Sequence, residues 1–273
     1  MHVTASIVTY NTDRDELARC LQSLASDSVH TIYISDNSPD DRLRGFCSSQ
    51  AKVEYVHNHG NIGYGAGHNV AIRRSMSAHA DYHLVLNSDV YFAPEIIESI
   101  ISYMEGNQDV AQLIPNVVYP DGSLQYVCRL LPTPMNLIFR RFLPSRMVES
   151  MNRRYLLKFW NHSHPLNVPY MQGSFMFFRT RCFETVGLFD ERFFMYPEDI
   201  DITRRMHRHY RTMFWPGVTI VHAHRASSYK SSKMLRVHMV NMVKYFNKWG
   251  WLFDKERRQW NRQLLETLNY GGH

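Results

Sequence analysis

The first hundred residues alternate between short apolar runs and amphipathic stretches, and this alternation limits the chain to few folds. Apolar runs predict strands at Val3–Tyr10, Thr31–Ser35, Lys52–His57 and Tyr82–Asn87. Between and after them, apolar residues at helical spacing predict helices over Asp15–Leu24, Gly67–Ala80 and Pro94–Met104. We therefore expect an α/β fold, with a mostly parallel central sheet flanked by helices on both faces.

A polar residue follows each of the four predicted strands. Thr9 and Asn11 follow the first, Asp36 the second, Asn61 the third and Asp89 the fourth. Any one of them has a structural explanation, since such residues commonly form turns. In sheets of this kind, however, ligands bind beyond the carboxyl ends of the strands. Because all four strands end this way, we interpret the set as one edge of a binding site.

Three acids stand together after the apolar run Phe193–Tyr196. Pro197 suits the first turn of a helix, which places Glu198, Asp199 and Asp201 in that turn. Dipole compensation, worth about 0.3–1 kcal/mol, is the structural explanation. It does not explain the apolar run directly before the acids. A carboxylate at the edge of an apolar wall has a raised pKa, and this is typical of a general base.

A glycine-rich segment, Asn61–Asn69, leads into the second predicted helix. Glycines let a backbone approach a ligand closely, and a helix N-terminus attracts phosphate. A dinucleotide-binding fingerprint would follow the first strand, with an acid about twenty residues further on. This segment comes after the third strand and has glycines at alternate positions, which argues against NAD binding. A nucleotide-binding loop and a purely structural glycine turn both stay open.

Asp89 and His222 are the candidates for a metal site. Asp89 ends an apolar strand, where a carboxylate can hold a hard cation that also contacts phosphate oxygens. One carboxylate alone is a weak metal site, and a turn before Pro94 is the structural alternative. His222 and His224 have strand spacing, so both imidazoles would share one face.

The composition is that of a basic globular protein. The chain has 273 residues, a net charge of +6 and a pI of about 9.1, which favours acidic partners. Its four cysteines form no CxxC pair, and no stretch resembles a signal peptide or a membrane span. We therefore expect a cytoplasmic protein.

The last part of the chain is basic and aromatic. Lysines and arginines alternate with aromatic residues from Lys244 to Arg262, and the segment after Met234 predicts one long helix. Such a segment can lie on an anionic membrane, or pack its aromatic side on the domain with its charges in water. Both interpretations stay open, and no motif supports nucleic-acid binding. We expect one compact domain over residues 1–228 and a helical extension over residues 229–273.

Taken together and in order, these segments resemble the family 2 glycosyltransferases, which have the GT-A nucleotide-sugar fold, and in particular a bacterial rhamnosyltransferase-like branch. The resemblance extends from Val3 to about Ser228. Each segment alone is weak, but their joint order and spacing are specific. The matching segments are Ile7–Asn11, Ser35–Ser38, Asn61–Asn69, Leu86–Asp89, Gly173–Met176, Phe189–Phe194, Glu198–Asp201 and His222.

The resemblance implies a role for each matching position. Asp199 would be the catalytic base, with Glu198 beside it. Asp89 would bind Mg²⁺ or Mn²⁺, and His222 would lie near the diphosphate as a second metal contact. Asn87 stands where many relatives have the first acid of this metal-binding element. The positions implied to bind the nucleotide-sugar donor are Thr9, Asn11, Asp36 (at the nucleobase), Asn61, Gly63, Gly67, Asn69 and Ser88.

Other charged residues near the site have expected roles as well. The departing diphosphate needs positive groups, for which Arg204 or Arg225 are candidates besides the metal. Asp190 is expected to cap a turn. Asp201 is expected to pair with Arg204 or Arg205 on the helix.

The activity that the resemblance implies is inverting sugar transfer in cell-envelope polysaccharide synthesis. The donor would be dTDP-rhamnose or another dTDP- or UDP-sugar. The acceptor would be a glycan, often lipid-linked in related enzymes, at the inner face of the plasma membrane, with peripheral membrane contact and no nucleic acid. Two alternatives stay open. One is a nucleotidyltransferase of similar fold, although Tyr10–Asp13 lacks the basic glycine-rich loop expected there. The other is a non-catalytic nucleotide-sugar-binding protein at the membrane surface.

Overall fold

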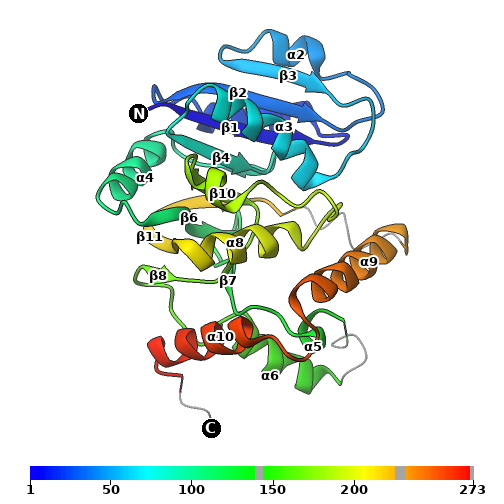
Figure 1. Cartoon of the computed structure of the whole chain (residues 1–273). Coiled ribbons are helices and arrows are strands. Elements are labelled where there is room, and N and C mark those ends of the chain that lie inside the picture. The colour runs from blue at the N-terminus through cyan, green and yellow to red at the C-terminus, as the bar shows by residue number, and fades with distance from the viewer. Residues whose placement is uncertain (139–143, 225–231, 271–273) are drawn as a thin grey trace.

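The structure is a computed structural model that describes residues 1–138, 144–224 and 232–270 (Figure 1). Its strands are β1 (Val3–Thr9), β2 (Val29–Asp36), β3 (Val53–His57), β4 (Tyr82–Leu86), β5 (Val90–Tyr91), β6 (Val110–Val118), β7 (Cys128–Arg129), β8 (Leu166–Asn167), β9 (Tyr170–Met171), β10 (Phe175–Arg179) and β11 (Arg211–His222). Its helices are α1 (Arg14–Ser23), α2 (Arg44–Ser48), α3 (Tyr64–Ser77), α4 (Glu95–Glu105), α5 (Pro134–Leu137), α6 (Ser145–Tyr155), α7 (Cys182–Val186), α8 (Glu198–His209), α9 (Ser232–Trp249) and α10 (Lys255–Thr267).

Nine of the described strands form one central sheet. Its order is β3-β2-β1-β4-β10-β6-β11-β5, and β8 pairs with β11. The first four strands are parallel, which confirms the prediction from the alternating pattern. Strand β10 lies antiparallel between β4 and β6, and Phe175 pairs with Leu86. This reversal brings the residues just before β10 to the carboxyl end of β4, where Asn87 N donates to Ser174 O at 3.0 Å.

Helices cover both faces of this sheet. Successive strand residues point to opposite faces, so Leu84 and Leu86 of β4 join one apolar cluster and Val85 joins the other. The first cluster also contains Leu17 of α1 and the isoleucines of α4. The second contains buried residues of α3, α7 and α8. The predicted α/β class is therefore confirmed.

The later part of the chain differs from the prediction in two places. The segment expected to be one long helix is two, α9 and α10. They are separated by Gly250, at a φ of +99°, and by Asp254, whose side chain caps α10 by accepting from Arg257 N at 3.0 Å. Earlier in the chain, residues 132–164 contain α5 and α6, for which no helix was predicted. Figure 1 shows α5, α6, α9 and α10 gathered at the end of the molecule opposite β3.

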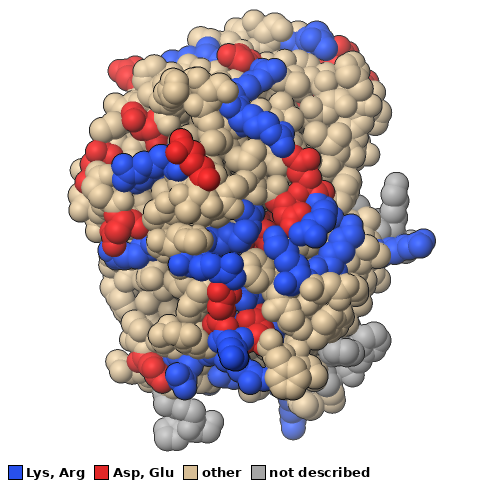
Figure 2. All heavy atoms as spheres, in the orientation of Figure 1, with Lys and Arg blue, Asp and Glu red and all other residues tan. Residues whose placement is uncertain are grey.

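The inner side of α9 packs on the rest of the molecule. Tyr245 and Phe246 are fully buried. Lys248 Nζ lies 2.8 Å from Asp190 Oδ2 and 2.6 Å from Asp201 Oδ1. Figure 2 shows basic and acidic side chains side by side on the face where α8, α9 and α10 meet. For these residues of the basic, aromatic segment, the packing explanation holds. The boundary between residues 228 and 229 stays a prediction.

The cysteines and the turn after Val118 are two further features. All four cysteines are free and buried. Val118 and Leu124 form a single antiparallel bridge across a turn that contains Gly122, at a φ of +83°. Within the described residues, no helix is both long enough and apolar enough to span a bilayer.

Candidate active site

Asp199 lies in the first turn of α8, beside the loop that precedes β10. It is 8% exposed. Its Oδ2 accepts from Gly173 N at 3.1 Å, and its Oδ1 from Ile200 N at 2.7 Å. A Cβ atom at position 173 would lie 3.0 Å from the Asp199 Cβ, so glycine permits this approach. Burial raises the pKa of Asp199 to about 7, against opposing effects of Arg129 and of the backbone N–H groups. A carboxylate with this pKa can accept a proton near neutral pH.

Glu198, the neighbouring acid, is also buried. Among the described residues, its Oε2 has no hydrogen-bond partner. Burial, together with the negative charge of Asp199, raises the pKa of Glu198 well above its usual range. Two carboxylates this close do not both ionise readily. Asp199 accepts hydrogen bonds from two backbone N–H groups and is therefore the better placed of the two to carry the negative charge.

The hydroxyl of Tyr64, which belongs to the segment Asn61–Asn69, contacts two other matching segments, Leu86–Asp89 and Gly173–Met176. The hydroxyl lies 2.7 Å from Gly173 O and 2.8 Å from Asn87 Oδ1. A hydroxyl has one proton, so only one of these oxygens can accept it, and the other contact requires the Asn87 amide to turn its N–H₂ toward Tyr64. Burial and the carboxylates of Glu198, Asp199 and Asp89 raise the pKa of Tyr64 far above its usual range. Tyr64 is thus a neutral donor among these acids, and it was not among the residues singled out from the sequence.

Asp89 and His222 meet at the ends of their strands. His222 Nε2 lies 3.2 Å from Asp89 Oδ1, and Ala223 N donates to Asp89 O at 2.9 Å. Gln125 orients the imidazole: its Nε2 donates to His222 O at 2.7 Å, which leaves its Oε1 to accept from His222 Nδ1 at 2.9 Å. With the proton on Nδ1, the Nε2 lone pair faces the Asp89 carboxylate. Two facing lone pairs at this distance require a proton or a cation between them.

This pair fits part of the ligand set of a divalent cation. Two neighbouring ligands of an octahedral ion with bonds of about 2.1 Å lie about 3.0 Å apart, close to the separation of Asp89 and His222. A hydrogen bond to the far nitrogen of a ligating histidine is also typical of metal sites, and Gln125 supplies it. Across the described residues, no group of three or more His, Cys, Asp or Glu side chains is placed to hold a metal. The remaining ligands would have to come from phosphate oxygens and water.

Arg129 on β7 is a basic residue of the site that the sequence did not reveal. Burial is the main cause of the lowered pKa of His224, and the Arg129 charge adds to it. The same charge opposes the burial that raises the pKa of Asp199, so Arg129 acts on both sides of the site. Its guanidinium donates to Tyr170 Oη and to Gln172 Oε1, each at 3.2 Å. A cation held in this way is suited to offset negative charge on a bound diphosphate. Position 129 belongs to no motif. The one feature of the sequence that could have pointed to this residue is an arginine next to a strand-like run.

The predicted nucleotide end lies where β1 and β2 finish. Asp36 is fully buried, and its Oδ2 accepts from Tyr55 Oη at 2.6 Å while its Oδ1 accepts from Ser38 N at 2.9 Å. Asn11 has a positive φ of 51°, and its N–H donates to Ser38 Oγ at 2.9 Å. Thr9 is buried, and its Oγ1 has no hydrogen-bond partner among the described residues. The structure thus brings Thr9, Asn11 and Asp36 together, with Tyr55 as a partner that the sequence did not reveal.

The glycines of the segment Asn61–Asn69 are explained largely by packing. Gly63 has a φ of +95°, and a Cβ there would lie 2.6 Å from Phe194 O. A Cβ at Gly67 would lie 2.7 Å from Val8 Cγ2, so Gly67 lets α3 pack closely on β1. Packing on β1 thus explains why position 67 is a glycine, and the expectation that Gly67 lines the donor stays a prediction.

The polar residues of the donor set fall into two groups. Asn69 is buried, with its Nδ2 donating to Phe189 O at 2.9 Å and its Oδ1 accepting from Phe189 N at 3.0 Å. It fixes the segment before α8, and the expectation that it binds the donor stays a prediction. Asn61 is exposed, and Ser88 is partly exposed with its Oγ donating to Glu16 Oε1 at 2.9 Å. These two stay candidates for donor contact.

Arg204 does not face the diphosphate end of the site. It is 1% exposed and pairs with Asp254 through both guanidinium nitrogens, each at 2.7 Å. The expectation that it stabilises the leaving group is corrected, because its charge is used inside the protein. Asp201 pairs with Arg205 at 2.8 Å, as predicted. Arg225 lies outside the described residues.

The chain is similar to sugar transferases over most of its length. It is 27% identical over 247 residues to rhamnosyltransferase WbbL of Escherichia coli, covering 88% of this chain and 90% of the relative. It is 26% identical over 262 residues to the N-acetylglucosaminyl-diphospho-decaprenol L-rhamnosyltransferase of Mycobacterium tuberculosis, covering 90% and 82%. The hexosyltransferase Agl10 of Haloferax volcanii is 30% identical over 206 residues, which are 74% of this chain and 61% of that protein.

Solved structures show the same fold. GalNAc-T7 with UDP, GalNAc and Mn²⁺ superposes with a TM-score of 0.67 at 14% identity, covering 99% of this chain and 53% of that one. S. aureus TarS 1-349 in complex with UDP-GlcNAc gives 0.60 at 17% identity, covering 99% and 74%. The predicted GT-A fold is thereby confirmed.

The family follows from the sequence match. The model of glycosyl transferase family 2 covers residues 4–187, more than half of the chain. This region contains Asp36, Asp89 and the glycine-rich segment, and it ends shortly before the acids of α8. The chain therefore belongs to glycosyl transferase family 2 and is a glycosyltransferase.

Proposed function

We propose that this enzyme moves a sugar from a nucleotide-sugar donor to a hydroxyl group of a glycan acceptor, with inversion at the anomeric carbon. The observation that carries the proposal is the Asp199 carboxylate, buried at a helix start with its pKa raised to about 7. A group of this kind is suited to take a proton at neutral pH. The names of the relatives from Escherichia coli and Mycobacterium tuberculosis make dTDP-rhamnose the first donor to test. Other dTDP- and UDP-sugars follow.

The proposed reaction is a single displacement. Asp199 takes the proton of the acceptor hydroxyl while that oxygen forms a bond to the anomeric carbon. The bond from this carbon to the diphosphate breaks on the opposite face, and its electron pair stays on the phosphate oxygen. Protonated Glu198 keeps a second negative charge away from Asp199. General-base assistance of this kind contributes about 10²–10⁴-fold in rate.

The diphosphate would lie at the Asp89–His222 end of the site. A divalent cation bound there would supply Lewis-acid stabilisation of the leaving group. Asp89 and His222 would hold it, Gln125 would orient His222, and Arg129 would add fixed positive charge. EDTA treatment should remove most of the activity, and Mn²⁺ or Mg²⁺ should restore it. If activity is unchanged after chelation, no metal is needed, and His222 and Arg129 alone would stabilise the charge on the leaving group.

The nucleobase would lie at the Asp36–Tyr55 end. Asp36→Ala should weaken UDP or dTDP binding markedly in a protein that stays folded, as measured by calorimetry. Tyr55→Phe is the matched control, because it removes only the hydroxyl that donates to Asp36. Unchanged nucleotide affinity in the folded Asp36→Ala protein would remove this assignment.

The acceptor is proposed to be a lipid-linked glycan at the cytoplasmic face of the membrane. The relative from Mycobacterium tuberculosis is named for an N-acetylglucosaminyl-diphospho-decaprenol acceptor, which supports this class. The net charge of +6 also favours an anionic acceptor or surface.

One experiment tests the reaction as a whole. The purified chain is incubated with a panel of dTDP- and UDP-sugars and glycosyl diphospholipid acceptors, and the product is analysed by mass spectrometry and NMR. We expect one glycosyl unit added, with the anomeric configuration opposite to that of the donor. Retention would refute the single displacement. Binding without turnover of any donor would favour the non-catalytic alternative, and nucleotide transfer would favour a nucleotidyltransferase.

A further inference from the structure

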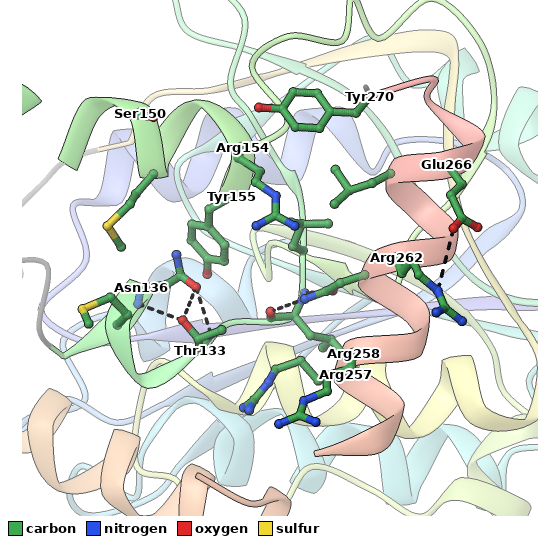
Figure 3. Close-up of a pocket in the computed structure, with 16 residues that line it drawn as sticks. Thr133, Asn136, Ser150, Arg154, Tyr155, Arg257, Arg258, Arg262, Glu266 and Tyr270 are labelled. Carbon is green, nitrogen blue, oxygen red and sulfur yellow. Dashed lines mark hydrogen bonds and ion pairs between the residues drawn. The ribbon is translucent and has the colours of Figure 1, made fainter. Parts of the chain in front are cut away.

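A large open pocket lies between α5, α6 and α10, outside the residues assigned to catalysis. Its volume is about 950 Å³. Leu130, Leu131, Met135 and Leu265 give it apolar walls. Figure 3 shows Arg154 reaching from α6 into the space in front of α10, with the arginines at the start of α10 on the other side. The pocket therefore combines apolar walls with positive charge, which suits a ligand that is both apolar and anionic.

Four arginines line this pocket, and two of them, Arg154 and Arg258, have no acidic partner among the described residues, whereas Arg257 lies 3.7 Å from Asp254. Arg154 has no ion pair or hydrogen bond from its side chain to any described residue, and Arg258 donates only to Leu252 O, at 3.0 Å. Glu266 is the one acid among the lining residues that the structure describes, and it lies 3.7 Å from Arg262. Guanidinium groups in this state are suited to phosphate oxygens.

A rigid corner with exposed apolar side chains borders the pocket. Leu252 is 68% exposed and Phe253 is 86% exposed, at the turn between α9 and α10. The turn is well fixed, since buried Arg257 donates to Gly250 O and to Trp251 O. Ordered apolar side chains held out in solvent mark an interaction site rather than a core. The Arg258 guanidinium, which lines the pocket, lies 5.8 Å from the centre of the Phe253 ring, so corner and pocket are continuous.

Strand β7 connects this pocket to the active site. Arg129, the basic residue that acts on Asp199, is followed directly by Leu130 and Leu131, which line the pocket. At a strand rise of about 3.3 Å per residue, Leu131 begins within about 7 Å of Arg129 along the chain. Asn261 of α10 fixes this segment through two hydrogen bonds to the Leu131 backbone, at 2.8 and 2.9 Å.

We propose that this pocket and corner bind the lipid diphosphate part of the acceptor at a bilayer surface. The diphosphate contacts Arg154 and Arg258, the first apolar units of the lipid lie against the exposed Met135 above the buried leucines of the pocket, and Leu252 and Phe253 insert into the membrane interface. The acceptor sugar then extends along β7 toward Asp199. This assignment rests on the proposed transferase function, and it confines membrane contact to a small part of the basic, aromatic segment.

Vesicle binding of the full chain tests the proposal. Phosphatidylcholine vesicles carry either a polyprenyl diphosphate or phosphatidylglycerol at equal surface charge. We expect binding to the diphosphate lipid to be tighter by about tenfold, the equivalent of one charge-assisted contact. Soluble pyrophosphate should compete. The double variant with Leu252→Ser and Phe253→Ser should weaken binding to both vesicle types by about tenfold or more.

A matched pair of arginines separates the pocket from general surface charge. Arg154→Gln should abolish the preference for the diphosphate lipid, whereas Arg153→Gln should keep it, because Arg153 is exposed on the same helix but does not line the pocket. Equal effects of the two changes would overturn the proposal. So would vesicle binding that the Leu252/Phe253 double variant leaves unchanged, or self-association in sedimentation that this variant removes. The proposed function is tested separately by wild-type turnover of a lipid-free acceptor, which needs no membrane.

Discussion

Two carboxylates in the first turn of α8 are both buried, yet their surroundings are opposite. Asp199 receives hydrogen bonds from the backbone N–H groups of Gly173 and Ile200, and burial raises its pKa to about 7. Asp201 is fully buried as well, but it lies 2.8 Å from Arg205 and 2.6 Å from Lys248. At 100° per residue, these side chains point about 200° apart around the helix. One helix therefore presents a reactive acid on one side and a structural ion pair on the other.

The comparison extends along the helix to its ion pairs with the C-terminal region. Arg204 pairs with Asp254 in the interior, and Arg208 pairs with Glu256 near the surface. The difference shows that burial by itself does not distinguish function from structure. What distinguishes the two acids is direct contact with a cation, which Asp201 makes with Arg205 and Lys248.

The largest effect is expected when Asp199, the reactive acid of the two, is replaced by a neutral residue. Asp199→Asn keeps the size of the side chain but cannot accept a proton at neutral pH. Turnover at saturating substrate should fall by about 10²–10⁴-fold, with nearly unchanged donor affinity. Glu198→Gln is the matched control and should lose less. Near-normal turnover by a folded Asp199→Asn enzyme with a verified acceptor would refute the role of Asp199.

The next effect concerns the buried ion pair. Asp254→Asn keeps a good N-cap for α10 but removes the bidentate partner of Arg204, which leaves this buried charge with Glu256 alone among the described acids, at 3.0 Å. The free energy of unfolding should fall by about 3–5 kcal/mol, measured by urea denaturation. Turnover per folded molecule should be retained at low temperature. A loss of stability below about 1 kcal/mol, the usual value for exposed pairs, would mean that this pair does not act as a buried one.

A smaller effect is expected from pH. The pKa of Asp199 is about 7 when folded and 3.8 when unfolded, so between these values the folded protein binds the extra proton. This stabilisation is present at low pH and is lost as the pH rises toward 7. From pH 4 to pH 7, wild type should lose stability relative to Asp199→Asn by on the order of 3 kcal/mol. Urea denaturation of both proteins across this range measures the difference. Parallel pH profiles would contradict the raised pKa.

The smallest effect is expected at the surface end of the helix. The side chains of Arg208 and Glu256 are 43% and 32% exposed, and their closest approach is 2.7 Å. Arg208→Gln should therefore change the free energy of unfolding by about 0.2–1 kcal/mol, and less at high salt. Thermal denaturation at two salt concentrations measures this. If Arg208→Gln lowers the free energy of unfolding as much as Asp254→Asn does, the buried and the exposed ion pair do not differ in their contribution to stability.

The sequence was sufficient for those parts of the site that depend on local pattern. The strands before Asp36 and Asp89 follow from apolar runs, and the helix start at Glu198 follows from Pro197 and the acids. Neither Arg129 nor Gln125 could be found this way. They reach the site from a segment without periodicity, through contacts with residues such as Gln172 and His222 that only the tertiary fold brings near.

The C-terminal helices show a different reason for failure. The sequence predicted one helix where there are two, although Gly250 and Asp254 carried the signals for a helix end and a helix start. The prediction of one helix relied on the regular recurrence of basic and aromatic residues and did not take these two positions into account. The exposure of Phe253 could not be predicted, because the same aromatic pattern also contains the fully buried Tyr245 and Phe246.

Lys248 has a consequence for how the enzyme matures during synthesis. This one ammonium group contacts Asp190, 58 positions earlier, and Asp201, so it closes both ends of the segment that carries Asp199. Until α9 has been synthesised, these two carboxylates lack that cation and keep only their nearer partners, Arg192 for Asp190 and Arg205 for Asp201. The segment that carries Asp199 can therefore be fixed at both ends by Lys248 only after the C-terminal region has been made and has folded.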